Sequence, residues 1–498
     1  MRADLVHEKR TSVVKVGLVN FSLRVLSSPL SFAFSYIVAH HLSRIDLELF
    51  GLWQSIFIYI TGLFAIPSNA LGYMTSRLAA EGRPVGLLVL LNLALGGVSG
   101  LVYVLAQPLL VPQSSNVDPR AVELAVVMVL LYYALTASNA VAKGRTPMVI
   151  GASATAFQVV RLAFLLVAFF VWKMTILGVV LAYSLGYLTQ ILVNLFFVKA
   201  NLGVEREVLP YALKGSIVLS VAYFQYILEA GLVWFANVIT QSTVPASYFE
   251  SATIITNVVL WTAALYSGVM KRVAETREPS VLVTALKLVA SVGMLAVVLD
   301  LDLAYPLLYY IRPEYTASLV IAFFLALSNY TRMVFMVYYE AFTVFDEGLG
   351  KTFKSLMGKM LVSNVFYAAV PLALGFAAIA ELHTRGPIVL GVVMASVMLA
   401  DSVLMAWNAQ SLAGKSLGVK FPWDTYIRSA LVAALTLAIT FPFSLTPHVG
   451  QALAVGVASL ALYVALSYLL NPYARTIITR SVREVKTVII SRADTHRR

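Results

Sequence analysis

The chain has 498 residues, of which 60% are hydrophobic and 12% are charged, and its mean hydropathy is +0.85. Soluble domains carry about 25% charged residues, so the composition excludes a soluble globular protein. No cysteine is present, which excludes disulfide frameworks, thiolate metal sites and cysteine nucleophiles. The formal net charge is +12. In a membrane protein we expect this excess to set the orientation and to contact lipids rather than to bind nucleic acid.

Apolar runs follow one another along most of the chain, and each is long enough for a transmembrane helix of about 20 residues. They predict an all-α polytopic membrane protein with about fourteen transmembrane helices. The N-terminal segment lacks the short apolar region and the cleavage site of a signal peptide, so the first run is kept as a span. The predicted spans lie at 13–41, 49–75, 85–110, 121–142, 147–171, 175–198, 211–240, 246–270, 280–303, 316–344, 355–380, 387–410, 427–445 and 449–470.

Basic residues are distributed unevenly over the predicted loops. With the N-terminus in the cytoplasm, the inner segments hold 27 of the 36 Lys and Arg residues, whereas the outer loops hold five. This distribution obeys the positive-inside rule, and adding or removing one span would destroy it. We therefore expect a multi-pass protein of the cytoplasmic membrane with both termini in the cytoplasm.

An internal repeat divides the predicted spans into two sets of six. Segment 132–146 recurs 206 residues later as 338–352, and both copies begin with Tyr-Tyr and end with Gly, a basic residue and Thr. The second predicted span also parallels the eighth at a similar offset. Because six is an even number, the two halves are expected to have the same orientation and to be related by an axis along the membrane normal.

The predicted domains follow from this repeat. They are an N-terminal lobe (1–205), a C-terminal lobe (206–415), two extra helices (416–470) and a basic amphipathic cytoplasmic tail (471–498). The tail has seven Lys and Arg residues, with apolar residues at helical intervals. We expect it to lie on membrane lipids of the cytoplasmic leaflet; docking to a partner protein is the alternative.

Three stretches, at 47–83, 143–164 and 227–258, resemble the polysaccharide-export branch of the multidrug/oligosaccharidyl-lipid/polysaccharide (MOP) superfamily, which includes the Wzx-like flippases. The resemblance covers residues 11 to about 415. A Tyr/Phe-Gly pair at the start of span two is usual in that family, and Phe50-Gly51 matches it. The family also commonly has an acidic residue in span seven, where Glu229 stands. The resemblance implies a two-lobed flippase that carries a polyprenyl-(pyro)phosphate-linked oligosaccharide between leaflets, for surface polysaccharide or glycoprotein assembly.

Three arginines lie near the middle of their predicted spans: Arg24, Arg161 and Arg332. A charged residue at the centre of a membrane helix costs about 2.5–3.5 kcal/mol on insertion scales and marks a pathway or an ion pair. A guanidinium group binds phosphate oxygens through two parallel hydrogen bonds and keeps its charge when desolvated. We predict that the three residues bind the anionic head group of the substrate. The alternative is that they form structural salt bridges with Glu229, Glu340 or Asp401.

Embedded carboxylates are the candidates for coupling to H⁺ or Na⁺, because a buried acid readily gains a proton. Glu229 and Asp401 lie within predicted spans, and Glu229 is the first choice. Pairing of either acid with an arginine is the alternative. Glu340 is a third candidate, and it can instead partner a basic group at the cytoplasmic mouth. Glu250, at the start of the eighth predicted span, is expected to complement the positive end of that helix.

Polar side chains within the spans are candidates for hydrogen bonds to sugar hydroxyls. Asn20 belongs to a polar stripe along the first span, for which a packing seam of small residues is the alternative. Tyrosines also populate the interface belts of membrane proteins, and such a position is the alternative for Tyr73. The predicted glycan contacts are Asn20, Gln54, Asn69, Tyr73, Gln225 and Asn257.

No enzymatic motif, cofactor motif or metal site is expected. Segment 348–352 ends like a phosphate-binding loop, but Phe345 stands where the first glycine is required. Asp300 and Asp302 form an acidic pair that we place in an outer loop as a solvated turn. Three other functions compete with a flippase: a multidrug or organic-cation antiporter of the MATE type, a membrane-embedded glycan polymerase, and a non-transporting scaffold.

Overall fold

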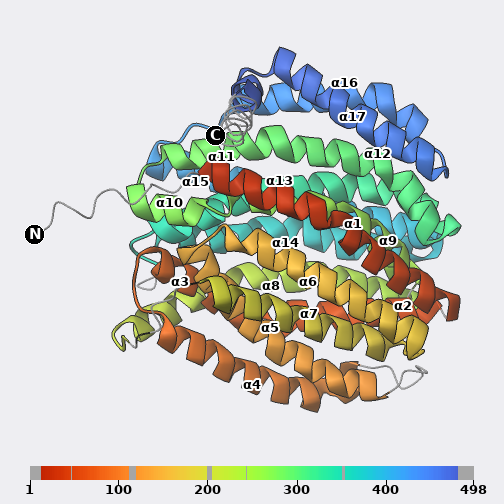
Figure 1. Ribbon diagram of the computed structural model, residues 1–498, viewed down its shortest axis with the longest axis horizontal. Coiled ribbons are helices and arrows are strands. Elements are labelled where there is room, and N and C mark those ends of the chain that lie inside the picture. Colours follow the sequence, from red (N-terminus) through yellow and green to blue (C-terminus); the bar gives the residue numbers. More distant parts are fainter. Residues whose placement is uncertain are drawn as a thin grey trace, which may run out of the picture.

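The computed structural model describes residues 13–45, 47–110, 119–198, 203, 205–242, 244–349 and 354–479. Within these ranges every regular element is a helix, as predicted, and the long helices run side by side (Figure 1). Twelve helical segments of the described chain are long and apolar enough to cross a membrane. The chain is therefore a polytopic all-helical membrane protein. The other two expected spans fall on α2–α3 and on α8, so the total of fourteen stays a prediction.

We call the helices before residue 199 the N-half and those between residues 205 and 417 the C-half. The N-half comprises α1 (Val13–Ile45), α2 (Leu47–Ile58), η1 (Tyr59–Leu63), α3 (Ile66–Ala80), α4 (Gly86–Leu110), α5 (Pro119–Arg145), α6 (Val149–Leu166), η2 (Val167–Val171) and α7 (Ile176–Phe197).

The C-half is followed by two helices at the edge of the bundle, α16 (Trp423–Ser444) and α17 (Val449–Leu470). Its elements are α8 (Val208–Thr240), α9 (Val244–Leu260), η3 (Trp261–Tyr266), α10 (Val269–Thr276), α11 (Ser280–Leu288), η4 (Val289–Gly293), α12 (Met294–Ile311), η5 (Pro313–Ser318), α13 (Leu319–Phe345), α14 (Leu356–Leu382), η6 (His383–Arg385) and α15 (Pro387–Leu417).

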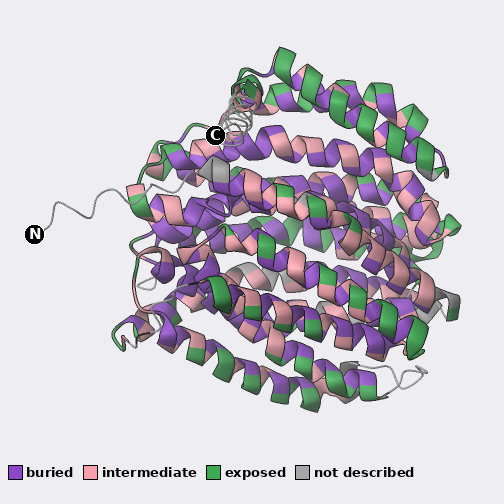
Figure 2. Ribbon diagram, in the orientation of Figure 1, coloured by how far each residue is buried: buried purple, intermediate pink, exposed green. Residues whose placement is uncertain are grey.

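Large apolar side chains are exposed along the peripheral helices. Leu105 on α4, Phe196 on α7 and Val457 on α17 are examples, and exposed positions follow α4, α16 and α17 in Figure 2. In water such surfaces would drive association. In a bilayer they face acyl chains, and the helix satisfies its own backbone hydrogen bonds. The exposure pattern thus fits a protein surrounded by lipid.

Three of the expected spans change helix type in their middle, and the span predicted at 280–303 does so at the π-helical turn η4, between α11 and α12. The other two resemble each other. The span predicted at 49–75 consists of α2, the π-helical turn η1 and α3, and Pro67 stands in the first turn of α3. The span predicted at 246–270 consists of α9, the 3₁₀ segment η3 and α10. These are the two spans that the sequence relates by its repeat. Interrupted membrane helices leave backbone groups available near the midplane, where transport sites are commonly built.

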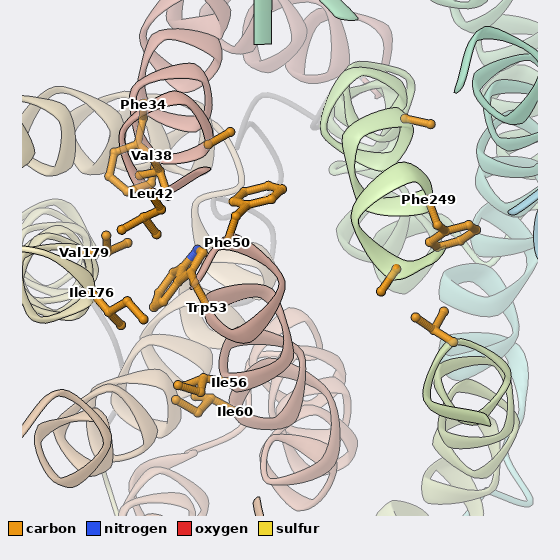
Figure 3. Close-up of a cluster of buried hydrophobic side chains, with 14 of the residues drawn as sticks. Phe34, Val38, Leu42, Phe50, Trp53, Ile56, Ile60, Ile176, Val179 and Phe249 are labelled. Atoms are coloured by element: carbon orange, nitrogen blue, oxygen red, sulfur yellow. The ribbon is translucent and has the colours of Figure 1, made fainter. Parts of the chain in front are cut away.

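Aromatic and aliphatic side chains fill the space where α1, α2 and α7 meet. Phe34, Phe50 and Trp53 are buried there among residues of all three helices (Figure 3). Phe249 of α9 lies across from Phe50 in the same view, on the other half of the protein. The two phenylalanines line the same cavity, which is described below.

The prediction for Asp300 and Asp302 was wrong. Both residues lie inside α12, which continues to Ile311 through the expected loop, and both are at least 97% buried. Asp302 Oδ2 accepts hydrogen bonds from Thr440 Oγ1 of α16 at 2.7 Å and from Ser459 Oγ of α17 at 2.6 Å. No local pattern indicated that the last two helices would bring hydroxyl groups to this helix, so the acidic pair was assigned to a loop.

Candidate functional site

Three cavities lie along the contact between the halves. The central cavity, of about 260 Å³, includes Thr61, Glu229 and Arg332 in its lining. A second cavity, which we call the basic-end cavity because Arg24 and Lys143 line it, has a volume of about 360 Å³ and shares Asn69 and Tyr73 with the central cavity. The α2–α9 cavity, of about 450 Å³, shares Thr61, Glu229 and Arg332 with the central cavity. Because neighbouring cavities share wall residues, they form a row along the interface.

The basic-end cavity contains Arg24 of α1. Among the described residues, the Arg24 side chain has neither an ion-pair partner nor a hydrogen-bond partner. Its neighbours in the lining include Lys143 of α5 and Glu340 of α13, which form an ion pair across the two halves. The pair neutralises itself, so Arg24 leaves this cavity with a net positive charge.

Arg161 of α6 lies in the wall of the α2–α9 cavity, inside a cage of aromatic rings. Its guanidinium carbon lies 3.8 Å from the ring centroid of Phe34, 4.7 Å from that of Phe157 and 4.6 Å from that of Tyr183. Arg161 Nη2 donates to Gln158 Oε1 at 2.5 Å. No carboxylate of the described chain pairs with it. Ring faces attract a desolvated guanidinium without neutralising its charge.

Arg332 of α13 and Glu229 of α8 form a buried ion pair. Arg332 Nη2 donates to Glu229 Oε1 at 2.7 Å and to Oε2 at 2.5 Å. The Glu229 side chain is 3% exposed and that of Arg332 is 24% exposed. The sequence left two roles open for Glu229, which were coupling to H⁺ or Na⁺ and pairing with an arginine. In the structure Glu229 is paired with Arg332. Arg332 keeps an accessible edge on two cavities.

The three predicted arginines do not share one cavity. Arg161 and Arg332 line the α2–α9 cavity, whereas Arg24 lines the basic-end cavity. Counting residues along each predicted span placed the three arginines at a similar depth in the membrane. That count could not anticipate the lateral position of each helix.

Two other acids lie in different surroundings from those expected. Asp401 of α15 is fully buried and lines none of the three cavities. Glu250 lies in the second turn of α9 rather than at its N-terminus, because the helix begins at Val244. It is 7% exposed and lines the α2–α9 cavity. Among the described residues it has no ion-pair partner.

Most of the predicted glycan contacts line the row of cavities. Gln54 and Asn257 lie in the α2–α9 cavity, and Asn69 and Tyr73 lie in the wall shared by the other two. The side chain of Gln225 lies outside the described part of the structure. With Asn20, which lies in the basic-end cavity, five of the six predicted residues thus line the row.

Asn20 is different, because its side chain connects the two halves. Asn20 Nδ2 donates to the Pro147 carbonyl and to Ser267 Oγ, both at 2.8 Å. Its Oδ1 accepts from the Gly151 amide at 3.1 Å. Both amide protons are committed to protein and the residue is fully buried, so a structural tie fits Asn20 better than a sugar contact does.

Polar contacts between the halves gather at one end of the bundle. We call it the basic end, where α3, α5, α10 and α13 finish. Five hydrogen bonds and ion pairs that join the N-half to the C-half lie there. Besides Asn20–Ser267 and Lys143–Glu340, they are Arg77 Nη1 to the Asp346 carbonyl at 2.8 Å, Lys271 Nζ to the Arg145 carbonyl at 2.9 Å, and Arg277 with Glu81 at 3.5 Å. The halves are therefore tied at the basic end.

Sequence reasoning missed several lining residues. Lys143 was counted only as an orientation signal, although it reaches a cavity. Tyr339 lies in the central cavity with its ring centroid 4.7 Å from that of Tyr73. It belongs to the repeated Tyr-Tyr pair, which was the available signal. Asn364 of α14 gave no signal, and its Oδ1 accepts from Asn408 Nδ2 at 2.7 Å.

Comparison with known proteins gives no match to a family model and no match to a curated protein sequence. Solved structures do match. A MATE protein in complex with MaL6 is 15% identical, with a TM-score of 0.61, and the alignment covers 81% of this chain and 97% of that one.

Two further structures match over a similar length. A MOP superfamily transporter from Pyrococcus furiosus is 15% identical, with a TM-score of 0.60 and coverage of 81% and 95%. An outward-facing multidrug resistance MATE family transporter is 14% identical, with a TM-score of 0.59 and coverage of 82% and 96%. This chain therefore has the fold of the MATE transporters of the MOP superfamily.

Proposed function

We propose that this protein is a transporter that carries a polyprenyl-(pyro)phosphate-linked oligosaccharide across the cytoplasmic membrane by alternating access. The observation that carries the proposal is Arg24, which lines the basic-end cavity and has no side-chain partner among the described residues. A half-buried cation that no carboxylate of the described chain neutralises attracts an anion, and a guanidinium fits the oxygens of a phosphate. The head group of a lipid-linked glycan supplies that anion.

The remaining lining residues support the same substrate. Arg161 keeps its charge inside the aromatic cage, and Arg332 presents one edge to two cavities. Gln54, Asn69 and Asn257 offer hydrogen bonds to sugar hydroxyls along the row. The head group and glycan would cross through the row of cavities while the polyprenyl chain stays in lipid.

The proposal also covers the orientation of the protein in the membrane and the conformational state of this structure. From the positive-inside distribution we infer that the basic end lies in the cytoplasm, together with both termini. The ties between the halves at that end then describe a state closed toward the cytoplasm. Transport requires a second state in which those ties are broken and the α2–α9 side closes.

A cation-coupled drug antiporter is the second candidate, and one observation favours it. Glu250 lines the α2–α9 cavity without an ion-pair partner in the described chain, among aromatic residues that include Trp53 and Phe249. An acid beside ring faces suits an organic cation. Of the carboxylates in the cavities, Glu229 and Glu340 are already paired with basic residues. Glu250 is therefore the first candidate for H⁺ or Na⁺ coupling in either mechanism.

One experiment separates the two candidates. Proteoliposomes carrying the full chain are given a fluorescent polyprenyl-pyrophosphate oligosaccharide or, in parallel, a fluorescent organic cation. We expect the lipid-linked glycan to cross, and Arg24→Ala to abolish its movement. Arg385→Ala is the matched control, because Arg385 is exposed and lines none of the cavities. Movement of the dye without the glycan, abolished by Glu250→Gln, would replace the flippase proposal with the antiporter.

A further inference from the structure

The basic-end cavity contains both a cation without a side-chain partner among the described residues and part of the tie between the halves. Arg24 comes from α1, Lys143 from the last turn of α5 and Glu340 from α13. We propose that Lys143 is a second ligand of the anionic group that Arg24 attracts, and that the bound anion displaces Glu340 from Lys143. Anion binding would then release the halves at the basic end. This inference rests on the proposed function, since it needs an anionic head group in this cavity.

The geometry of the Lys143–Glu340 ion pair allows another anion to replace Glu340 at the ammonium group. Glu340 Oε1 holds the ammonium, whereas Glu340 Oε2 has no hydrogen-bond partner among the described residues. The Lys143 side chain is 20% exposed and that of Glu340 is 2% exposed, so the ammonium is the accessible member of the pair. Lys143 Nζ also lies 5.2 Å from the centroid of the Tyr73 ring, in the wall shared with the central cavity. An ammonium has three donors, and a ligand in the cavity can reach it.

An anion in this cavity changes the balance of charges. It carries the same sign as Glu340, so the two compete for Lys143 and repel each other in surroundings of low dielectric. A phosphate oxygen replaces the carboxylate oxygen as the acceptor of the ammonium. Arg24 and Lys143, both in the N-half, then hold the anion together, and Glu340 of the C-half loses its partner.

The loss matters because the same cavity contains a second tie. Asn20 lines it and joins the Pro147 carbonyl of the N-half to Ser267 of the C-half. A ligand shifts a conformational equilibrium only when it binds one state more tightly. Here the separated state offers Lys143 free of Glu340, so the anion favours separation. The structure thereby links recognition of the head group to the opening of the basic end.

The experiment measures the distance between the halves in the full chain, reconstituted in nanodiscs. Because the protein has no cysteine, Met148→Cys and Glu278→Cys introduce two spin labels at exposed positions of the basic end, one on each half. The probe is inorganic pyrophosphate, with binding followed separately by calorimetry. We expect pyrophosphate to move the label distances toward longer values. Glu340→Gln is expected to show the longer distances without pyrophosphate.

Variants of Lys143 complete the design. We expect Lys143→Gln to weaken pyrophosphate binding about tenfold, which corresponds to about 1.4 kcal/mol. The double variant Lys143→Gln with Glu340→Gln removes both charges, so it tests binding without leaving a buried acid unpaired. Lys359→Gln is the matched control, since Lys359 is an exposed lysine that lines none of the cavities.

The outcomes separate the inference from the function on which it rests. Pyrophosphate that binds in an Arg24-dependent way but leaves the label distances unchanged would overturn the displacement of Glu340 and leave the proposed function standing. Binding of wild-type strength in both Lys143 variants would overturn the role of Lys143. If pyrophosphate does not bind the wild-type chain at all, the anion site and the inference both fail.

Discussion

Arg332 of α13 donates from a single nitrogen to both carboxylate oxygens of Glu229 on α8. The acid is almost completely buried and the arginine is partly exposed to two cavities. Removing one partner of a buried ion pair costs about 3–5 kcal/mol, because the other charge stays buried alone, whereas removing both costs far less. The two residues therefore need to be tested together.

We expect Arg332→Gln to lower the midpoint of thermal unfolding by several degrees. Arg332→Gln combined with Glu229→Gln should recover most of that loss, since an amide pair needs no counter-ion. The measurement is a thermal melt of the purified protein in detergent, followed by intrinsic fluorescence. A double variant that melts as low as Arg332→Gln would show that the cost comes from lost packing of the arginine and not from the unpaired acid.

Arg24 should behave in the opposite way, because no group of the described chain depends on its charge. We expect Arg24→Ala to abolish transport with little change in thermal stability. Arg161→Ala should reduce both, since the aromatic cage of Phe34, Phe157 and Tyr183 would lose its central cation. Melting curves and transport assays on the same preparations check this contrast. A large loss of stability in Arg24→Ala would mean that the arginine is structural.

Much of the fold could be predicted from the sequence, because a membrane span has a strong composition signal. The helix α15 (Pro387–Leu417) contains the span expected at 387–410, and α13 contains most of the span expected at 316–344. The break between α2 and α3 was not anticipated. Thr61, Gly62 and Pro67 gave only a weak local signal, and hydropathy averaged over a window does not respond to a change of helix type.

The site was harder to predict, since it depends on which helices become neighbours. The sequence identified Glu229 and Arg332 as unusual but could not determine that they face each other from α8 and α13. It placed Asp302 in a loop because the partners that satisfy it lie 138 and 157 residues further along the chain. Burial of single charged residues is visible in a sequence, whereas their pairing is a property of tertiary packing.

The contact between α1 and η3 is tight enough to be tested with one methyl group. A Cβ atom at Gly17 would lie 2.1 Å from the Leu265 carbonyl oxygen, closer than any real contact. At Gly97 of α4 a Cβ atom would meet nothing within 4 Å. Alanine stabilises a helix interior by about 0.5–1 kcal/mol relative to glycine when the site has room.

Gly17→Ala should therefore lower the unfolding midpoint and increase the distance between labels at Met148→Cys and Glu278→Cys, since α1 belongs to the N-half and η3 to the C-half. Gly97→Ala should leave both measurements unchanged or raise the midpoint slightly. Equal behaviour of the two variants would contradict the close approach of α1 to Leu265.

Asp302 joins α12 to both of the last two helices. Its hydrogen bonds predict that removing the acid and removing the two hydroxyl groups affect stability unequally. Thr440 Oγ1 and Ser459 Oγ each lie 2.8 Å from a carbonyl oxygen of their own helix, besides contacting the carboxylate. If Asp302 is removed, each hydroxyl can still donate within its helix. If the hydroxyls are removed, Asp302 loses both donors in a fully buried position.

We therefore expect Thr440→Val with Ser459→Ala to destabilise the protein more than Asp302→Ala does. A hydrogen bond to a charged group contributes about 1.5–3 kcal/mol, whereas a neutral hydroxyl with a second acceptor loses little. Hydrogen exchange of α16 and α17, measured in all three proteins, locates the effect, and thermal melts give its size. Faster exchange in Asp302→Ala than in the hydroxyl-free protein would reverse the order. It would mean that the carboxylate is needed to hold the two helices on α12, because the hydroxyls would then have no adequate acceptor within their own helices.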